Sequence, residues 1–140
     1  MMSRTAEIKL TVELDDDDVP TRIEWEASEA RGTGPTPCQS MMLSLWDDER
    51  KTIAAIDLWI KDTGIDDMNL YFYQAIHQMA DTYLRATKNP DPAKLIHEFG
   101  ESFGATVGLV SNAGSNRASR AKPLVDLISL ADGNRQRNPD

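Results

Sequence analysis

The sequence has a single cysteine, Cys38, and its longest apolar runs fall well short of the roughly 20 residues that a membrane-spanning helix requires. One cysteine excludes an internal disulfide and favours a reducing compartment. The N-terminus leads directly into an alternating strand pattern, so we expect no signal peptide. We therefore expect a cytoplasmic protein without membrane insertion.

Histidine is also scarce, and the sequence lacks the residue spacings typical of metal or catalytic sites. Neither His77 nor His97 has a cysteine or a second histidine three or four residues away. The run Asp15–Asp18 lacks the spaced ligands and the glycine of a calcium loop, so it reads as a solvated turn. We expect no catalytic residues, no metal and no cofactor.

Basic residues are outnumbered, with 15 Lys and Arg against 23 Asp and Glu, for a formal net charge of −8. Residues 105–140 carry five basic and three acidic side chains, so residues 1–104 carry ten and twenty. Nucleic-acid binding depends on clustered cations that replace counterions. The acidic body therefore argues against a nucleic-acid partner.

Two patterns with a period of two begin the chain, whose 140 residues suit one domain. Ile8, Leu10, Val12 and Leu14 alternate with polar residues, which predicts a strand with one buried face. A second strand is predicted over residues 21–27, with Ile23 and Trp25 inward. Residues 28–37 have the glycine and proline content of a surface loop.

Residues 40–61 predict two further strands around an acidic turn at residues 47–51. One face would carry Met41, Leu43, Leu45, Ala54, Ile56, Leu58 and Ile60. The other face would carry Met42, Trp46, Ile53, Ala55 and Trp59. An apolar residue set on both faces requires a cover on both sides.

The pattern changes to helical periodicity from Asp66 to Thr87, and Asp91-Pro92 predicts the N-cap and first residue of a second helix. This order predicts an α+β fold, a four-stranded antiparallel sheet followed by two C-terminal helices packed on one face. We expect a single domain over 1–108 and a polar, partly disordered tail over 109–140. A short amphipathic helix near 123–132 would either dock on the domain or serve as a linear motif.

Met42, Trp46, Ile53 and Trp59 are the candidate protein-contact residues. Burying both tryptophans would contribute roughly 8 to 12 kcal/mol before the costs of association. The alternative is that the tail or a helix of the same chain covers them.

Both histidines have structural interpretations. His97 falls opposite Leu95, Ile96 and Phe99 on the second helix, so we expect it in solvent. His77 shares a helix side with Tyr73 and Leu84, which is typical of a packed or hydrogen-bonded histidine. A nucleophilic pair of Cys38 and His77 is the enzymatic alternative, but Cys38 has no local activating signature.

Five segments in order resemble the gliding-motility-associated protein C family (GldC-like). They are EIKLTVELD (7–15), IEWEAS (23–28), MMLSLWD (41–47), IDLWIKD (56–62) and MADTY (79–83), and they contain all three tryptophans. The resemblance covers about residues 3–104. The chain departs from the family pattern in the loop at 32–37 and beyond about residue 105. It implies a small cytoplasmic accessory protein of gliding motility, in bacteria whose motility machinery shares parts with a protein secretion system.

We therefore predict a non-catalytic adaptor of the gliding machinery that binds motility or secretion components and forms a homo-oligomer. Two alternatives stay open. The order of strands and helices matches that of SecB-type export chaperones, which suggests a holdase for unfolded proteins. A small enzyme of unknown chemistry is the other.

Overall fold

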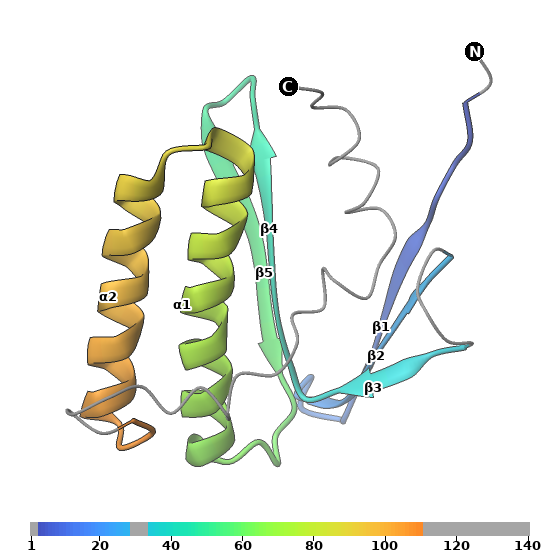
Figure 1. The fold of residues 1–140 in the computed structure, drawn as a ribbon. Helices are drawn as coiled ribbons and strands as arrows, with labels where there is room; N and C mark the ends of the chain where they lie inside the picture. The colour runs from blue at the N-terminus through green and yellow to red at the C-terminus, as the bar shows by residue number, and fades with distance from the viewer. Residues whose placement is uncertain (1–2, 29–33, 111–140) are drawn as a thin grey trace. The chain divides into compact units, whose positions relative to one another are not determined.

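The computed structural model describes residues 3–28 and 34–110, which form two compact units, one ending at Thr63 and the other beginning at Gly64 (Figure 1). The first unit contains β1 (Ile8–Leu14), β2 (Pro20–Ala27), β3 (Thr36–Cys38), β4 (Ser40–Asp47) and β5 (Thr52–Trp59). The second contains α1 (Ile65–Thr87) and α2 (Pro90–Thr106). The α+β class and the C-terminal position of the helices are confirmed.

The predicted packing of the helices on a sheet face and the domain bounds 1–108 stay predictions. The segment near 123–132 lies outside the described residues.

The predicted single sheet of four strands is wrong, because the strands form two antiparallel sheets. One has the order β1-β2-β3 and the other pairs β4 with β5. β3 begins inside the segment that we predicted as a loop, residues 28–37, and it pairs with β2 through Ile23–Cys38 and Trp25–Thr36. A strand has two hydrogen-bonding edges, and β1 and β3 take both edges of β2. β4 pairs with β5 in the second sheet.

Gln39 separates β3 from β4 at the point where the chain passes from one sheet to the other. The backbone N–H of Ile60 donates to the Gln39 carbonyl at 2.9 Å, and that of Lys61 donates to the Pro20 carbonyl at 3.0 Å. These bonds tie the open end of the β4–β5 ribbon to the three-stranded sheet. The core of this unit includes Ile23, which is fully buried.

Both hairpin turns are built on an aspartate. Asp15 Oδ1 accepts hydrogen bonds from the N–H groups of Asp17 and Val19, as predicted for a turn there. In the second turn Asp47 Oδ1 accepts from the N–H groups of Glu49 and Arg50. Each aspartate thus accepts hydrogen bonds from two backbone N–H groups of its turn, which the pairing of the strands leaves without an acceptor.

α2 begins two residues earlier than expected. Its N-cap is Asn89, whose side chain accepts from the Asp91 N–H at 3.2 Å, and Pro90 occupies the first helical position. The predicted pair, Asp91-Pro92, repeats the same cap-and-proline pattern two residues later. Asn and Asp cap equally well, so the sequence alone did not distinguish the two pairs.

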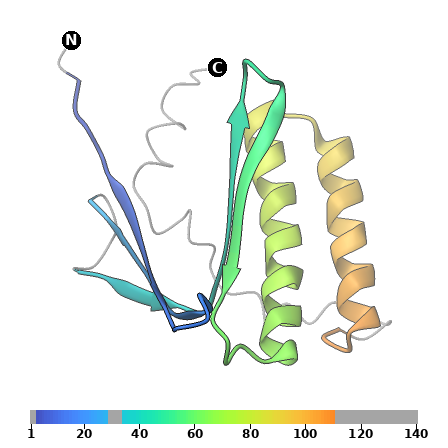
Figure 2. The same ribbon diagram turned by 180° about the vertical axis from the view of Figure 1, so that it is seen from behind.

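The two helices lie side by side in both ribbon views and pack through small residues (Figures 1 and 2). The buried residues of α2 are Ala93, Gly100 and Gly104. A Cβ atom on Gly100 would lie 2.8 Å from His77 Nε2, and one on Gly104 would lie 2.7 Å from Tyr73 Cε1. The missing side chains allow the two helices to approach closely.

Candidate functional site

The β4–β5 ribbon places the predicted contact residues on one face. Opposite residues in an antiparallel pair point to the same side of the sheet. The register therefore brings together four rungs, which we call the tryptophan face: Ser40–Trp59, Met42–Asp57, Ser44–Ala55 and Trp46–Ile53. Asp57 carries the one charged side chain among these eight.

The tryptophan face is largely open. The exposed fractions of the four candidate residues are 43% for Met42, 62% for Trp46, 59% for Ile53 and 56% for Trp59. Ser44, Ala55 and Asp57 are exposed as well, and Ser40 is half-buried. The structure thus groups the candidate residues as predicted, while their role in protein contact stays a prediction.

The opposite face of the ribbon is also apolar but less open. Met41, Leu43 and Leu58 are half-buried, whereas Leu45 and Ile56 are 56% and 52% exposed. An isolated two-stranded ribbon is marginally stable in water, and apolar packing on its faces is what stabilises it. This is the physical reason to expect that the tryptophan face contacts another surface.

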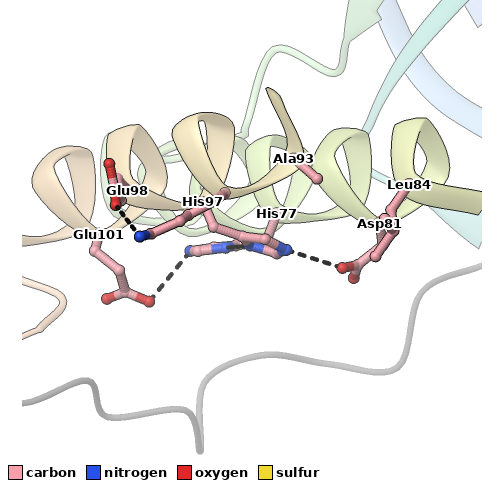
Figure 3. Close-up of a pocket in the computed structure, with 8 residues that line it drawn as sticks. His77, Asp81, Leu84, Ala93, His97, Glu98 and Glu101 are labelled. Atoms are coloured by element: carbon pink, nitrogen blue, oxygen red, sulfur yellow. Dashed lines mark hydrogen bonds and ion pairs between the residues drawn. The ribbon is translucent and has the colours of Figure 1, made fainter. Parts of the chain in front are cut away.

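A polar cluster between α1 and α2 is the second candidate site (Figure 3). The Nδ1 atoms of His77 and His97 lie 2.6 Å apart, and the two rings are stacked. His97 Nε2 lies 3.0 Å from Asp81 Oδ1, and His77 Nε2 lies 3.4 Å from Glu101 Oε1. The Tyr73 hydroxyl donates to the same Glu101 oxygen at 3.3 Å.

The short distance between the two Nδ1 atoms requires a proton on one of them, since two lone pairs would repel each other. One imidazole N–H therefore donates to the Nδ1 of the other ring, in the direction that the tautomer sets. All four ring nitrogens then face protein groups. His77 is 2% exposed, and the cluster serves to join the two helices.

A hollow of about 640 Å³ adjoins this cluster. Its lining combines both histidines with acidic, basic and aliphatic residues: His77, Asp81, Leu84, Ala93, Lys94, His97, Glu98 and Glu101. Within residues 3–28 and 34–110, no group of three or more His, Cys, Asp or Glu side chains has a geometry that could hold a metal ion.

The solvent position predicted for His97 is wrong. His97 contacts α1, and the large apolar residues Leu95 and Phe99 of α2 are exposed instead, at 67% and 61%. Apolar periodicity misled the prediction, because the glycines of α2 form the contact and carry no hydrophobic signal. One pattern in the sequence could have indicated the cluster. His77 and Asp81 are four residues apart on one face of α1, and His97 and Glu101 are four residues apart on one face of α2. The buried position predicted for His77 is confirmed.

Cys38 lies in β3 and is half-buried. Burial raises the pKa of its thiol above the ordinary value. A raised pKa lowers the fraction of reactive thiolate, which is the opposite of what a nucleophilic cysteine requires.

The described residues define a small α+β protein with two antiparallel sheets and a C-terminal helical hairpin. A profile of the GldC-like family, described as "Gliding motility-associated protein GldC-like", matches residues 20–109. The chain belongs to this family, and the resemblance is confirmed. Comparison with curated proteins gave no match, and neither did comparison with solved structures.

The matched segment begins at β2 and ends just after α2, so it includes the tryptophan face and the histidine cluster. The family description links the chain to gliding motility. Neither α1 nor α2 is long and apolar enough to cross a membrane.

Proposed function

We propose that this protein is a non-catalytic, cytoplasmic accessory component of the gliding motility machinery that acts through protein contacts on its tryptophan face. Membership of the GldC-like family supports the link to motility. The observation that carries the contact role is the open apolar surface of Met42, Trp46, Ile53 and Trp59 on one face of the ribbon.

Tryptophan is the residue most suited to such a surface. A few residues supply most of the binding energy of a typical interface, and tryptophan is enriched among them. Trp46 and Trp59 lie at opposite ends of the tryptophan face, with smaller residues between them. A partner that covers this face would bury both ends and the apolar centre together.

Two observations support the absence of catalysis. The four ring nitrogens of His77 and His97 face each other or a carboxylate, so none of them is directed at a substrate. Burial also raises the pKa of Cys38. The enzymatic alternative would need a nucleophile or a base that points into an open site.

Gliding of a bacterium that lacks its own copy tests the proposal. We expect the wild-type chain to restore gliding and Trp46→Glu/Trp59→Glu to fail, with both proteins folded by circular dichroism and present at equal levels. Leu95→Glu/Phe99→Glu is the matched control, because it places two acidic residues on an equally exposed apolar surface of α2. Normal gliding by the folded Trp46→Glu/Trp59→Glu variant would refute the proposal.

A holdase for unfolded proteins is the second candidate. The observation in its favour is that apolar residues are exposed on both faces of the ribbon and on both helices, as Leu45, Trp46, Met79 and Phe99 show. The structural analogy to SecB-type chaperones is weaker than the sequence suggested, since five strands rather than four precede the helices. Suppression of the aggregation of an unfolded substrate protein would favour this function, and no suppression would favour a dedicated adaptor.

A further inference from the structure

We propose that the tryptophan face packs against the same face of a second copy of this chain, with the two ribbons antiparallel. This inference rests on the proposed function, because it names the first partner of the same surface. Its basis is the pattern of large and small side chains along the four rungs, together with the position of the one charge on the face.

Large and small residues alternate along the β4 side of the face: Ser40, Met42, Ser44 and Trp46. A two-fold axis perpendicular to the strands places β4 over β4 of the second copy in reverse order. Trp46 then lies opposite Ser40, and Met42 lies opposite Ser44. Each large side chain thus meets a small one, which is how facing layers interdigitate without voids.

The β5 side fits the same arrangement. Ile53 lies opposite Trp59, which brings two large apolar side chains together at each end of the face. Asp57 lies opposite Ala55, and the cross-strand neighbour of that Ala55 is Ser44. The Ser44 hydroxyl of the second copy can therefore donate a hydrogen bond to the Asp57 carboxylate. A carboxylate that is removed from water needs such a donor.

A two-fold axis parallel to the strands gives a poorer fit. It places Ser44 opposite Ala55, so two small residues face each other and leave a void. It also places Asp57 opposite the apolar side chain of Met42. The antiparallel arrangement avoids both defects, and the face is self-complementary in that orientation alone, as an isologous dimer requires.

The area of the face suits a dimer of moderate affinity. At 62% and 56% exposure, the two tryptophans offer about 200 to 300 Å² per copy, given about 150 to 250 Å² for a whole aromatic side chain. With the other six side chains we expect about 1,000 Å² buried over both copies, near the lower limit for a specific interface. We expect a dissociation constant of about 1 to 100 μM, in the range of a weak interface.

Sedimentation velocity of the full chain from about 1 to 300 μM, which spans that range, tests the inference. We expect a monomer–dimer equilibrium for the wild type and at least a 30-fold larger dissociation constant for Trp46→Glu. Leu95→Glu is the matched control and should dimerise as the wild type does. A wild-type monomer at the highest concentration overturns the inference, whether the face is covered by another protein or by the same chain.

Asp57→Asn distinguishes a second copy from a basic partner. In the dimer an amide removes the cost of desolvating a charge and can still accept from Ser44, so we expect dimerisation at least as tight as that of the wild type. Several-fold weaker dimerisation would show that Asp57 meets a cation, and it would overturn the arrangement.

The register is tested with a labelled Trp46→Glu copy titrated with two unlabelled variants. In the antiparallel arrangement residue 40 meets residue 46, so Ser40→Lys should bind the labelled copy at least tenfold more tightly than Ile53→Lys. In the parallel arrangement residue 53 meets residue 46 and the order reverses. Equal or reversed affinities reject the antiparallel dimer.

Gliding separates this inference from the function on which it rests. A monomeric wild-type protein whose Trp46→Glu/Trp59→Glu variant cannot glide would retain the proposed function and reject the dimer. A wild-type dimer whose disruption leaves gliding unchanged would retain the dimer and reject the proposed function.

Discussion

At the scale of single residues, Gly100 and Gly104 determine how closely α2 approaches α1. The sequence marked them as helix-weakening positions, because glycine costs about 1 kcal/mol relative to alanine in a helix. The structure shows why glycine fits both positions: Cβ atoms added there would lie 2.8 Å and 2.7 Å from the rings of His77 and Tyr73. Both rings are buried and have little room to move.

Gly100→Ala and Gly104→Ala should therefore destabilise the protein although alanine favours helix. Overpacking costs about 1 to 3 kcal/mol and the better helix propensity returns about 1 kcal/mol, so we expect a net loss of up to about 2 kcal/mol for each. Urea unfolding followed by circular dichroism measures it. Ser102→Ala, at an exposed position of the same helix, should change stability little, and an equally stable Gly100→Ala would contradict the close packing.

His97→Leu should lower the free energy of unfolding by about 1 to 3 kcal/mol, because it removes the hydrogen bond that buried His77 Nδ1 makes with His97 Nδ1. Lys94→Ala is the control, since Lys94 forms an exposed pair with Glu98 at 3.9 Å and such pairs contribute little. The same unfolding measurement applies. A loss no greater than that of Lys94→Ala would mean that the contact between the histidines does not hold the helices together.

At the scale of elements, the two hairpin turns share one electrostatic device. Hydrogen bonds from the backbone N–H groups of Val19 and Asp17 lower the pKa of Asp15. The pKa of Asp47 is lowered by the backbone N–H of Arg50 and then by the Arg50 side chain. A carboxyl group with a lowered pKa binds fewer protons in the folded state than in the unfolded state.

The stability that these two carboxylates contribute is present above their ordinary pKa, near pH 4, and is lost as the pH falls through the lowered folded values. Asp15→Asn/Asp47→Asn should therefore be less stable than the wild type at pH 7 and lose less of its stability on acidification. Denaturant unfolding at a series of pH values from 7 to 2 checks both effects. Asp16→Asn, in the same acidic run, should follow the wild-type curve, and parallel curves for all three proteins would refute this account.

At the scale of the whole molecule, the net charge of −8 opposes the association of two copies. The tryptophan face carries one of those charges per copy, so most of the repulsion acts from outside the contact. Added salt screens such repulsion over a Debye length of about 10 Å at 0.1 M. Salt bridges would give the opposite dependence.

The dissociation constant of the inferred dimer should therefore fall severalfold between low salt and about 0.5 M NaCl, where screening is nearly complete. Sedimentation velocity at both salt concentrations measures the change. Leu95→Glu, with one more negative charge outside the face, should show a slightly larger effect. A dimer that weakens with salt would point to ion pairs and contradict the apolar contact.

Most of the strands and helices were predictable, because their signals are local. Alternation with a period of two located β1, β2, β4 and β5, and helical periodicity located α1. The same alternation grouped Met42, Trp46, Ile53 and Trp59 on one face, since side chains of a strand point alternately to its two sides. The GldC-like segments could be recognised for the same reason, since each is a local run of the sequence.

The tertiary structure alone decided which edges and which helix faces meet. Every strand offers the same backbone donors and acceptors, so no sequence pattern specified that β3 would take the second edge of β2 and leave β4 and β5 as a separate sheet. Glycine has no side chain to mark a contact face, so the approach of α2 to α1, and with it the pairing of His97 with His77, depended on fit in three dimensions.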